Sequence, residues 1–108
     1  MTAASIRRTA LALVLAGSPA VAAEHVVGMA NMAYSPSSLV AKVGDVIRFK
    51  NDDPGENHTV FVPTKGFGID LGQQKPNEVR ELMLFKAGTF DVECVLHDHM
   101  HLRVTVVP

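Results

Sequence analysis

From residue 25 onward, the apolar residues of this chain alternate with polar ones or cluster in short runs, and Gly, Pro, Asn and Asp separate the runs. A period of two is typical of β-strands with one buried face, whereas an amphipathic helix needs a period of about 3.6. No stretch carries a helical pattern longer than one turn. The pattern predicts strands at 25–30, 38–43, 45–51, 58–63, 78–85, 88–95 and 102–108, with a further short strand at 68–71. Short strands with turn signals this closely spaced predict one all-β sandwich or barrel of about seven to eight strands.

The first 23 residues differ in composition from the rest. Arg7 and Arg8 precede an apolar run at 10–16, and small residues follow that run. This order is typical of a cleavable signal peptide, and the apolar run is well short of the ~20 residues that a membrane-spanning helix needs. We therefore expect a signal peptide over residues 1–23, one mature domain over residues 24–108 without a membrane span, and export to the periplasm.

Two cleavage points are compatible with the end of this segment. Ala20 and Ala22 satisfy the small-residue rule for a cut after Ala22, and a cut after Ala23 is also allowed. The first cut makes His25 the third residue, so that the free amine, two backbone amides and the imidazole could hold Cu(II) in a square plane. The second cut makes His25 the second residue and removes that possibility.

The chain has a single cysteine, Cys94. Small exported domains often rely on disulfides, because their hydrophobic cores are marginal. One cysteine cannot form an internal disulfide, so its thiol indicates an intermolecular bridge, a nucleophile or a metal ligand. Alternation in 88–95 puts Cys94 on the same face as Phe90 and Val92, so we expect the thiol to point inward at the end of a strand.

Further metal donors are expected near this thiol. Cys94 begins the sequence CVLHDHMH, in which His97 and Met100 follow in the same turn. His58 opens another strand after the sequence NDDPGEN, which predicts a loop at 51–57. Two imidazoles and a thiolate with a weak axial thioether suit copper in both oxidation states, and they suit electron transfer. Zinc bound by another histidine instead of Met100 remains an alternative, as does a Cys–His nucleophile, although no oxyanion-hole motif is visible.

Three segments carry a family resemblance: MANMAYSPSSLVAKVGDVIRFKNDD, NHTV and AGTFDVECVLHDHM. Together they resemble the small blue copper proteins, the cupredoxins of the plastocyanin, pseudoazurin and amicyanin group, and the loop spacing is most similar to amicyanin. The resemblance implies an eight-stranded Greek-key β-sandwich with one mononuclear type 1 copper that shuttles single electrons, and not an enzyme. It implies that His58, Cys94 and His97 are the equatorial ligands and Met100 the axial one. It also implies that Asn57 ties the two ligand loops together.

The chain departs from the amicyanin-like pattern in its last loop. Where that pattern has proline on both sides of the second histidine, this chain has Leu96 and Asp98. Proline has no N–H, so Leu96 restores a backbone donor, and we expect it to contact the cysteine sulfur. His99 and His101 flank Met100, so either histidine could displace the methionine from the axial position.

Two functions from different classes remain open. The ligand set favours a diffusible electron carrier, whereas an exchangeable binding point in HDHMH would suit copper delivery or resistance. Removal of residues 1–23 leaves a net charge of about −3, so nucleic acid is not an expected partner. The acidic residues Asp52, Asp53 and Glu56 could steer a basic redox partner, such as a c-type cytochrome, to the copper. We expect the mature protein to be a monomer.

Overall fold

The computed structural model describes residues 21–108, so the expected signal peptide lies outside the described residues except for its last three positions. This part of the chain folds into nine β-strands. They are β1 (Glu24–Ala30), β2 (Ala33–Ser35), β3 (Ser38–Lys42), β4 (Val46–Asn51), β5 (His58–Val62), β6 (Ile69–Gln74), β7 (Val79–Met83), β8 (Gly88–Glu93) and β9 (His101–Val107). Within residues 21–108, no helix is long and apolar enough to cross a membrane.

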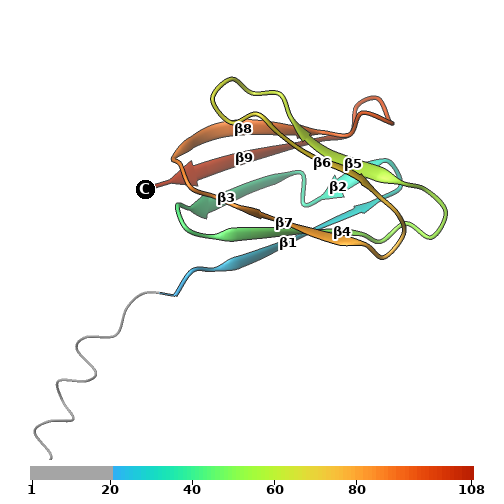
Figure 1. Cartoon of the computed structure of the whole chain (residues 1–108), viewed down its shortest axis with the longest axis horizontal. Helices are drawn as coiled ribbons and strands as arrows, with labels where there is room; N and C mark the ends of the chain where they lie inside the picture. The colour runs from blue at the N-terminus through green and yellow to red at the C-terminus, as the bar shows by residue number, and fades with distance from the viewer. Residues whose placement is uncertain (1–20) are drawn as a thin grey trace, which may run out of the picture.

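The strands form two sheets packed face to face (Figure 1). The four-stranded sheet has the order β2-β1-β4-β7, and the five-stranded sheet has the order β3-β9-β8-β5-β6. Most neighbours are antiparallel, but β1 pairs with β4 and β3 pairs with β9 in parallel. The predicted all-β sandwich is therefore confirmed.

The core lies between the sheets and follows the predicted alternation. Phe90 and Val92 in β8, and Cys94 directly after it, are buried on one side, whereas Glu93 is exposed. The same pattern in the other strands buries Val27, Met29, Ile47, Phe49, Leu102, Val104 and Val106. Burial of apolar side chains on one face of each sheet provides the main stabilisation of such a fold.

The strand count is nine instead of the expected seven to eight, because β2 was not predicted. β2 has three residues and pairs with β1 through a two-residue turn. Asn31 and Met32 form this turn with φ angles of 54° and 57°, which is the conformation that suits the twist of a tight hairpin. β6 is also longer than the predicted short strand at 68–71, and it extends to Gln74.

Three strand ends meet at one end of the sandwich, and this arrangement positions the histidines and the cysteine. β4 ends at Asn51, β5 begins at His58, and β8 ends at Glu93, one residue before Cys94. β5 and β8 are neighbours in one sheet, with Phe61 opposite Glu93. The segments 52–57 and 94–100 are therefore brought together although they are about 40 residues apart in the sequence.

Candidate metal centre

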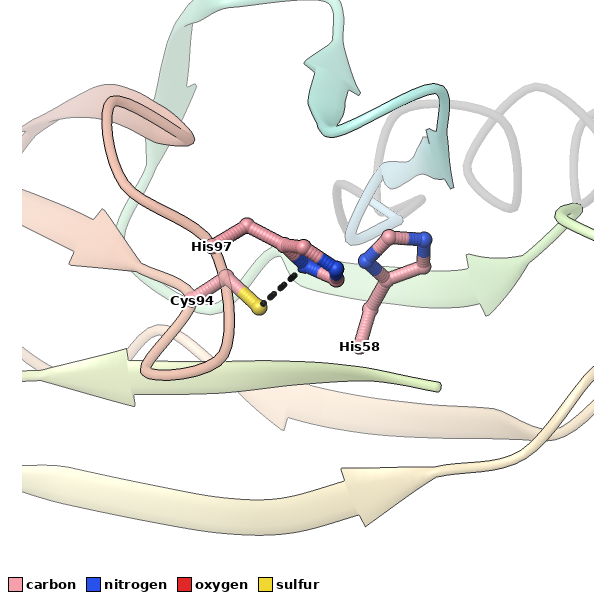
Figure 2. Close-up of side chains that lie close together, drawn as sticks. All are labelled: His58, Cys94 and His97. Carbon is pink, nitrogen blue, oxygen red and sulfur yellow. Dashed lines mark hydrogen bonds between the residues drawn. The ribbon is translucent and has the colours of Figure 1, made fainter. Parts of the chain in front are cut away.

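His58, Cys94 and His97 converge at this end of the sandwich, as Figure 2 shows. One candidate ligand atom from each side chain lies within 4.8 Å of the others. His58 is fully buried at the start of β5, and Cys94 is buried directly after β8. His97 comes from the loop between β8 and β9, and its ring centroid lies 4.8 Å from that of His58. The predicted convergence of these three side chains is confirmed.

Asn51 fixes the loop that leads into His58. Its side chain is fully buried and makes three hydrogen bonds. The amide Nδ2 donates to the backbone oxygens of Glu56 at 2.8 Å and Gln74 at 2.9 Å, and Oδ1 accepts from the N–H of Asp53 at 2.9 Å. The loop is thereby folded back onto β4 and β6, so that Asp53 and Glu56 face the two histidines.

A carboxylate bonds to the Nε2 atom of each histidine. His58 Nε2 lies 3.1 Å from Asp53 Oδ2, and His97 Nε2 lies 2.9 Å from Glu56 Oε1. An ionised carboxylate can only accept a hydrogen bond, so each Nε2 carries a proton, and a ring that binds a metal does so through the lone pair of Nδ1. These carboxylate contacts fix the orientation of each ring and leave Nδ1 available to bind a metal.

The Nδ1 atom of His58 has no hydrogen-bond partner in the described part of the chain, and it is buried. A buried polar atom without a partner costs free energy, so such atoms are rare in folded proteins. A metal ion held between His58, Cys94 and His97 would satisfy this atom. The orphaned nitrogen is therefore direct structural support for a metal site.

The sulfur of Cys94 accepts hydrogen bonds that favour its thiolate form. The backbone N–H of Thr59 donates to Sγ at 3.3 Å, and His97 Nδ1 lies 3.5 Å from the same sulfur. Burial raises the pKa of the thiol, but the N–H groups of Leu96 and Thr59 together with the His97 ring lower it more, so the pKa falls from 9.0 to about 6. The Cys94 sulfur and the Glu56 carboxylate in turn raise the pKa of His97.

This depressed pKa leads to a prediction for the metal-free protein. We expect Cys94 to be a thiolate at neutral pH and to become protonated with a midpoint of about pH 6. Because the folded pKa is below the unfolded one, the group stabilises the fold at high pH, and this contribution is lost as the pH falls toward 6. Ultraviolet thiolate absorbance and thermal melts across this range measure both effects. A midpoint near pH 9 would contradict the expectation.

Met100 lies inside the protein, whereas the histidines on either side of it are exposed. Met100 is 2% exposed, and its backbone oxygen accepts a hydrogen bond from the N–H of Cys94 at 3.3 Å. His99 is exposed with a φ of 64°, and His101 is exposed with Nε2 3.0 Å from Asp91 Oδ1. These positions favour the methionine over His99 and His101 as the fourth donor.

Thr59, and not Asn57 as expected, makes the hydrogen bonds that join the start of β5 to the segment at Cys94. The Asn57 side chain donates to Gln73 Oε1 at 3.2 Å on the surface, so that expectation was wrong. Thr59 contacts Cys94 Sγ through its N–H, and its Oγ1 accepts from the N–H of Val95 at 2.8 Å. Sequence analysis missed this role of Thr59, although a polar residue directly after a ligand histidine was a usable signal.

The donors fit copper better than the alternatives considered. One soft thiolate, two imidazole nitrogens and a buried thioether match a mononuclear type 1 copper site. Zinc bound by a further histidine is not favoured, because His99 and His101 point to the surface instead. His25 is remote from this site and bonds to Asp45 at the opposite end of β4.

No protein-family model matches the chain, and a search of curated proteins finds no match. Solved structures do match. A reduced-state structure of an amicyanin mutant has 30% sequence identity and a TM-score of 0.69, over 84% of this chain and 87% of that chain. The reduced Cu(I) form of another amicyanin mutant has 29% identity and a TM-score of 0.71, over 84% and 87% of the two chains.

A copper-containing nitrite reductase from Thermus scotoductus SA-01 also matches, with 22% identity and a TM-score of 0.75. It covers 87% of this chain but only 26% of the reductase, and at this identity the likeness concerns the fold alone. The amicyanin matches span most of both chains and agree with the donor set described above. The chain therefore belongs to the small type 1 blue copper proteins, the cupredoxins of the amicyanin type.

Proposed function

We propose that this protein is an exported, periplasmic carrier of single electrons, in which His58, Cys94, His97 and Met100 would hold one copper ion. Bound copper supplies the chemistry, because it exchanges one electron between its two oxidation states. The observation that carries the proposal is the preformed site: His58, Cys94 and His97 bring one ligand atom each to within 4.8 Å of the others, and both histidines are fixed through Nε2. A site that is already arranged changes little on electron exchange, which suits a carrier.

His97 is the ligand through which the electron would leave. Its side chain is 13% exposed, whereas that of His58 is not exposed at all. Val95 and Leu96, next to His97, are large apolar residues that lie on the surface. They would provide a small apolar contact for a redox partner, and a transient partner needs only a small and weak interface.

The charge around His97 favours a basic partner. Two of the three acidic residues in this loop have close partners. Asp52 lies 3.5 Å from the Lys50 ammonium, and Asp53 forms a hydrogen bond with His58. Glu56 is exposed and bonds directly to His97, so its charge lies at the point where the electron leaves. Complementary charge speeds encounter between partners, and a c-type cytochrome with a basic face would be steered to this edge.

A kinetic experiment tests the proposed steering. We expect electron exchange with a basic cytochrome to slow as ionic strength rises, because salt screens the attraction. Glu56→Gln is expected to slow exchange several-fold at low salt and to weaken its salt dependence. Asp52→Asn is the matched control, since Asp52 is already paired, and it should change the rate less. Exchange rates that do not respond to salt would reject a basic partner.

Retention of copper separates the carrier from the copper-handling alternative. A carrier should keep its copper through repeated oxidation and reduction in the presence of a competing chelator, whereas a delivery protein should release it. We expect retention, because the site is buried and His101, in the HDHMH segment, is held by Asp91. The optical spectrum of the copper-loaded protein follows the site through each cycle. Release of copper on the first reduction would favour delivery over electron transfer.

Leu96 supplies a prediction for the reduction potential. Its N–H is among the groups that lower the pKa of the Cys94 thiol, and stabilisation of negative charge on the sulfur disfavours Cu(II). Leu96→Pro removes the donor, so we expect the potential to fall by roughly 40 mV, from a hydrogen bond of about 1 kcal/mol and ~59 mV per tenfold change. Leu96→Ala keeps the N–H and is the control. A potential that rises or does not change in Leu96→Pro would show that this contact has no effect.

A further inference from the structure

Asp45 forms a buried anionic site at the end of the sandwich opposite the histidines. It lies in the turn between β3 and β4, whereas His58 follows the other end of β4. The residue is only 6% exposed, yet its carboxylate accepts three hydrogen bonds. The donors are the N–H groups of Ala23 and Lys42 and the His25 ring, each at 2.9 Å. These contacts hold the pKa of Asp45 at about 2, with the His25 bond as the largest cause, so the carboxylate is charged at neutral pH.

Both backbone polar groups of Ala23 form hydrogen bonds with the start of β4 and the turn before it. Its N–H donates to Asp45 Oδ1, and its carbonyl oxygen accepts from the N–H of Val46 at 3.0 Å. β1 begins at the next residue, Glu24, and residues 21–24 are exposed. Ala23 therefore contributes two backbone hydrogen bonds to this end of the sandwich, directly before β1 begins.

We propose that export ends with a cut after Ala22, and that the α-ammonium group of Ala23 then forms an ion pair with Asp45. The proposal depends on the export proposed above. In the cut, a secretory peptidase adds water across the Ala22–Ala23 bond. The C–N bond breaks, the hydroxyl joins the carbonyl carbon of Ala22, and the nitrogen of Ala23 takes the remaining proton and the one that the new carboxyl group releases. A neutral N–H donor thus becomes a cation that already faces a carboxylate, and charged hydrogen bonds are stronger than neutral ones.

The alternative cut after Ala23 would remove two contacts. Asp45 would lose one of its three donors, and the N–H of Val46 would lose its acceptor. A buried carboxylate that loses a donor is destabilised, as is a backbone N–H without a partner. The cut after Ala22 keeps both bonds and adds charge to one of them, so the structure favours Ala23 as the mature N-terminus.

The ion pair also bears on the square-planar copper site considered for His25. That site needs a deprotonated amine, because the lone pair of the nitrogen would bind Cu(II). An α-ammonium group held by Asp45 keeps its proton and cannot bind Cu(II). We therefore expect the mature, folded protein to bind one copper and not two.

Chains with defined first residues test the ion pair directly. We compare copper-loaded proteins that begin at Ala22, Ala23 and Glu24. The chain that begins at Ala22 keeps the same nitrogen as a neutral amide, so it isolates the effect of the charge. We expect the chain that begins at Ala23 to melt highest, by roughly 3–8 °C over the chain that begins at Ala22.

Two variants show whether Asp45 causes this difference. Asp45→Asn should abolish it, whereas Asp70→Asn should preserve it, because Asp70 is exposed and, within residues 21–108, its side chain bonds only to the nearby N–H of Gly72. If Asp45→Asn does not fold, the reactivity of the α-amine is measured instead, in the protein without substitutions. We expect an acylating reagent to modify this amine several-fold more slowly in the native chain than in urea.

The outcomes that overturn the proposal are distinct from a failure of export. Equal melting temperatures for the first two chains, or equal acylation rates in the native and unfolded states, would reject the ion pair. A second Cu(II) bound by the chain that begins at Ala23, but not by the one that begins at Ala22, would also reject it. An intact mass that places Glu24 first in the exported protein would reject the cut. A chain that keeps its first 22 residues would contradict export. The chains with defined first residues would still test the ion pair between Ala23 and Asp45.

Discussion

Replacement of Cys94 by serine is expected to abolish the intense blue absorption of the copper-loaded protein. That absorption arises from charge transfer between a thiolate sulfur and Cu(II), and Cys94 is the single cysteine of the chain. A serine hydroxyl is a harder donor and stays protonated at neutral pH, so it would not replace the thiolate. The absorption spectrum after addition of Cu(II) measures this effect, and copper affinity should fall with it.

The fold should survive this substitution. Serine is close in size to cysteine, and the N–H of Thr59, which donates to Cys94 Sγ, would find an oxygen acceptor in its place. We expect a stability loss of less than about 2 kcal/mol in the metal-free protein, which thermal melts would show. Met100→Leu is the matched control, because it should keep the colour and raise the potential. A blue Cys94→Ser protein would contradict the assignment of the copper site.

The strands could be predicted because burial on one face imposes a period of two on the sequence. β8 is the clearest case, since Phe90, Val92 and Cys94 alternate with polar residues and are all buried. β2 could not be predicted in this way, because three residues are too few to show a period. Its formation depends on the turn at Asn31 and Met32, where two residues without glycine adopt positive φ angles.

The candidate ligands could be predicted because their chemistry is visible in single residues. A lone cysteine near histidines and a methionine already indicates a soft metal, whatever the fold. The residues that support the ligands could not be predicted in this way, since their roles depend on how the loop at 52–57 is folded. Asp53 and Glu56 were recognised as charged loop residues, but their bonds to His58 and His97 follow from the loop conformation. No local pattern indicated that conformation.

Asn51→Ala is expected to have the largest effect on stability, because Asn51 determines that loop conformation. The change would remove three side-chain hydrogen bonds in a fully buried position and leave the oxygens of Glu56 and Gln74 without their donor. At about 1 kcal/mol for each bond, the loss is about 3 kcal/mol. For a domain of this size it corresponds to a fall in melting temperature of roughly 12–24 °C.

The same substitution should also loosen the copper site, because Asp53 and Glu56 would no longer be held against the histidines. We expect weaker copper binding and a changed spectrum in whatever fraction of the protein folds, and copper titration at low temperature would measure both. Asn57→Ala is the matched control. It removes an asparagine from the same loop, but that side chain makes one surface bond, to Gln73, so its cost should stay below about 1 kcal/mol. Equal losses in the two variants would mean that burial of Asn51 and its three bonds do not stabilise the loop, and that the histidines are positioned by β5 and β8 alone.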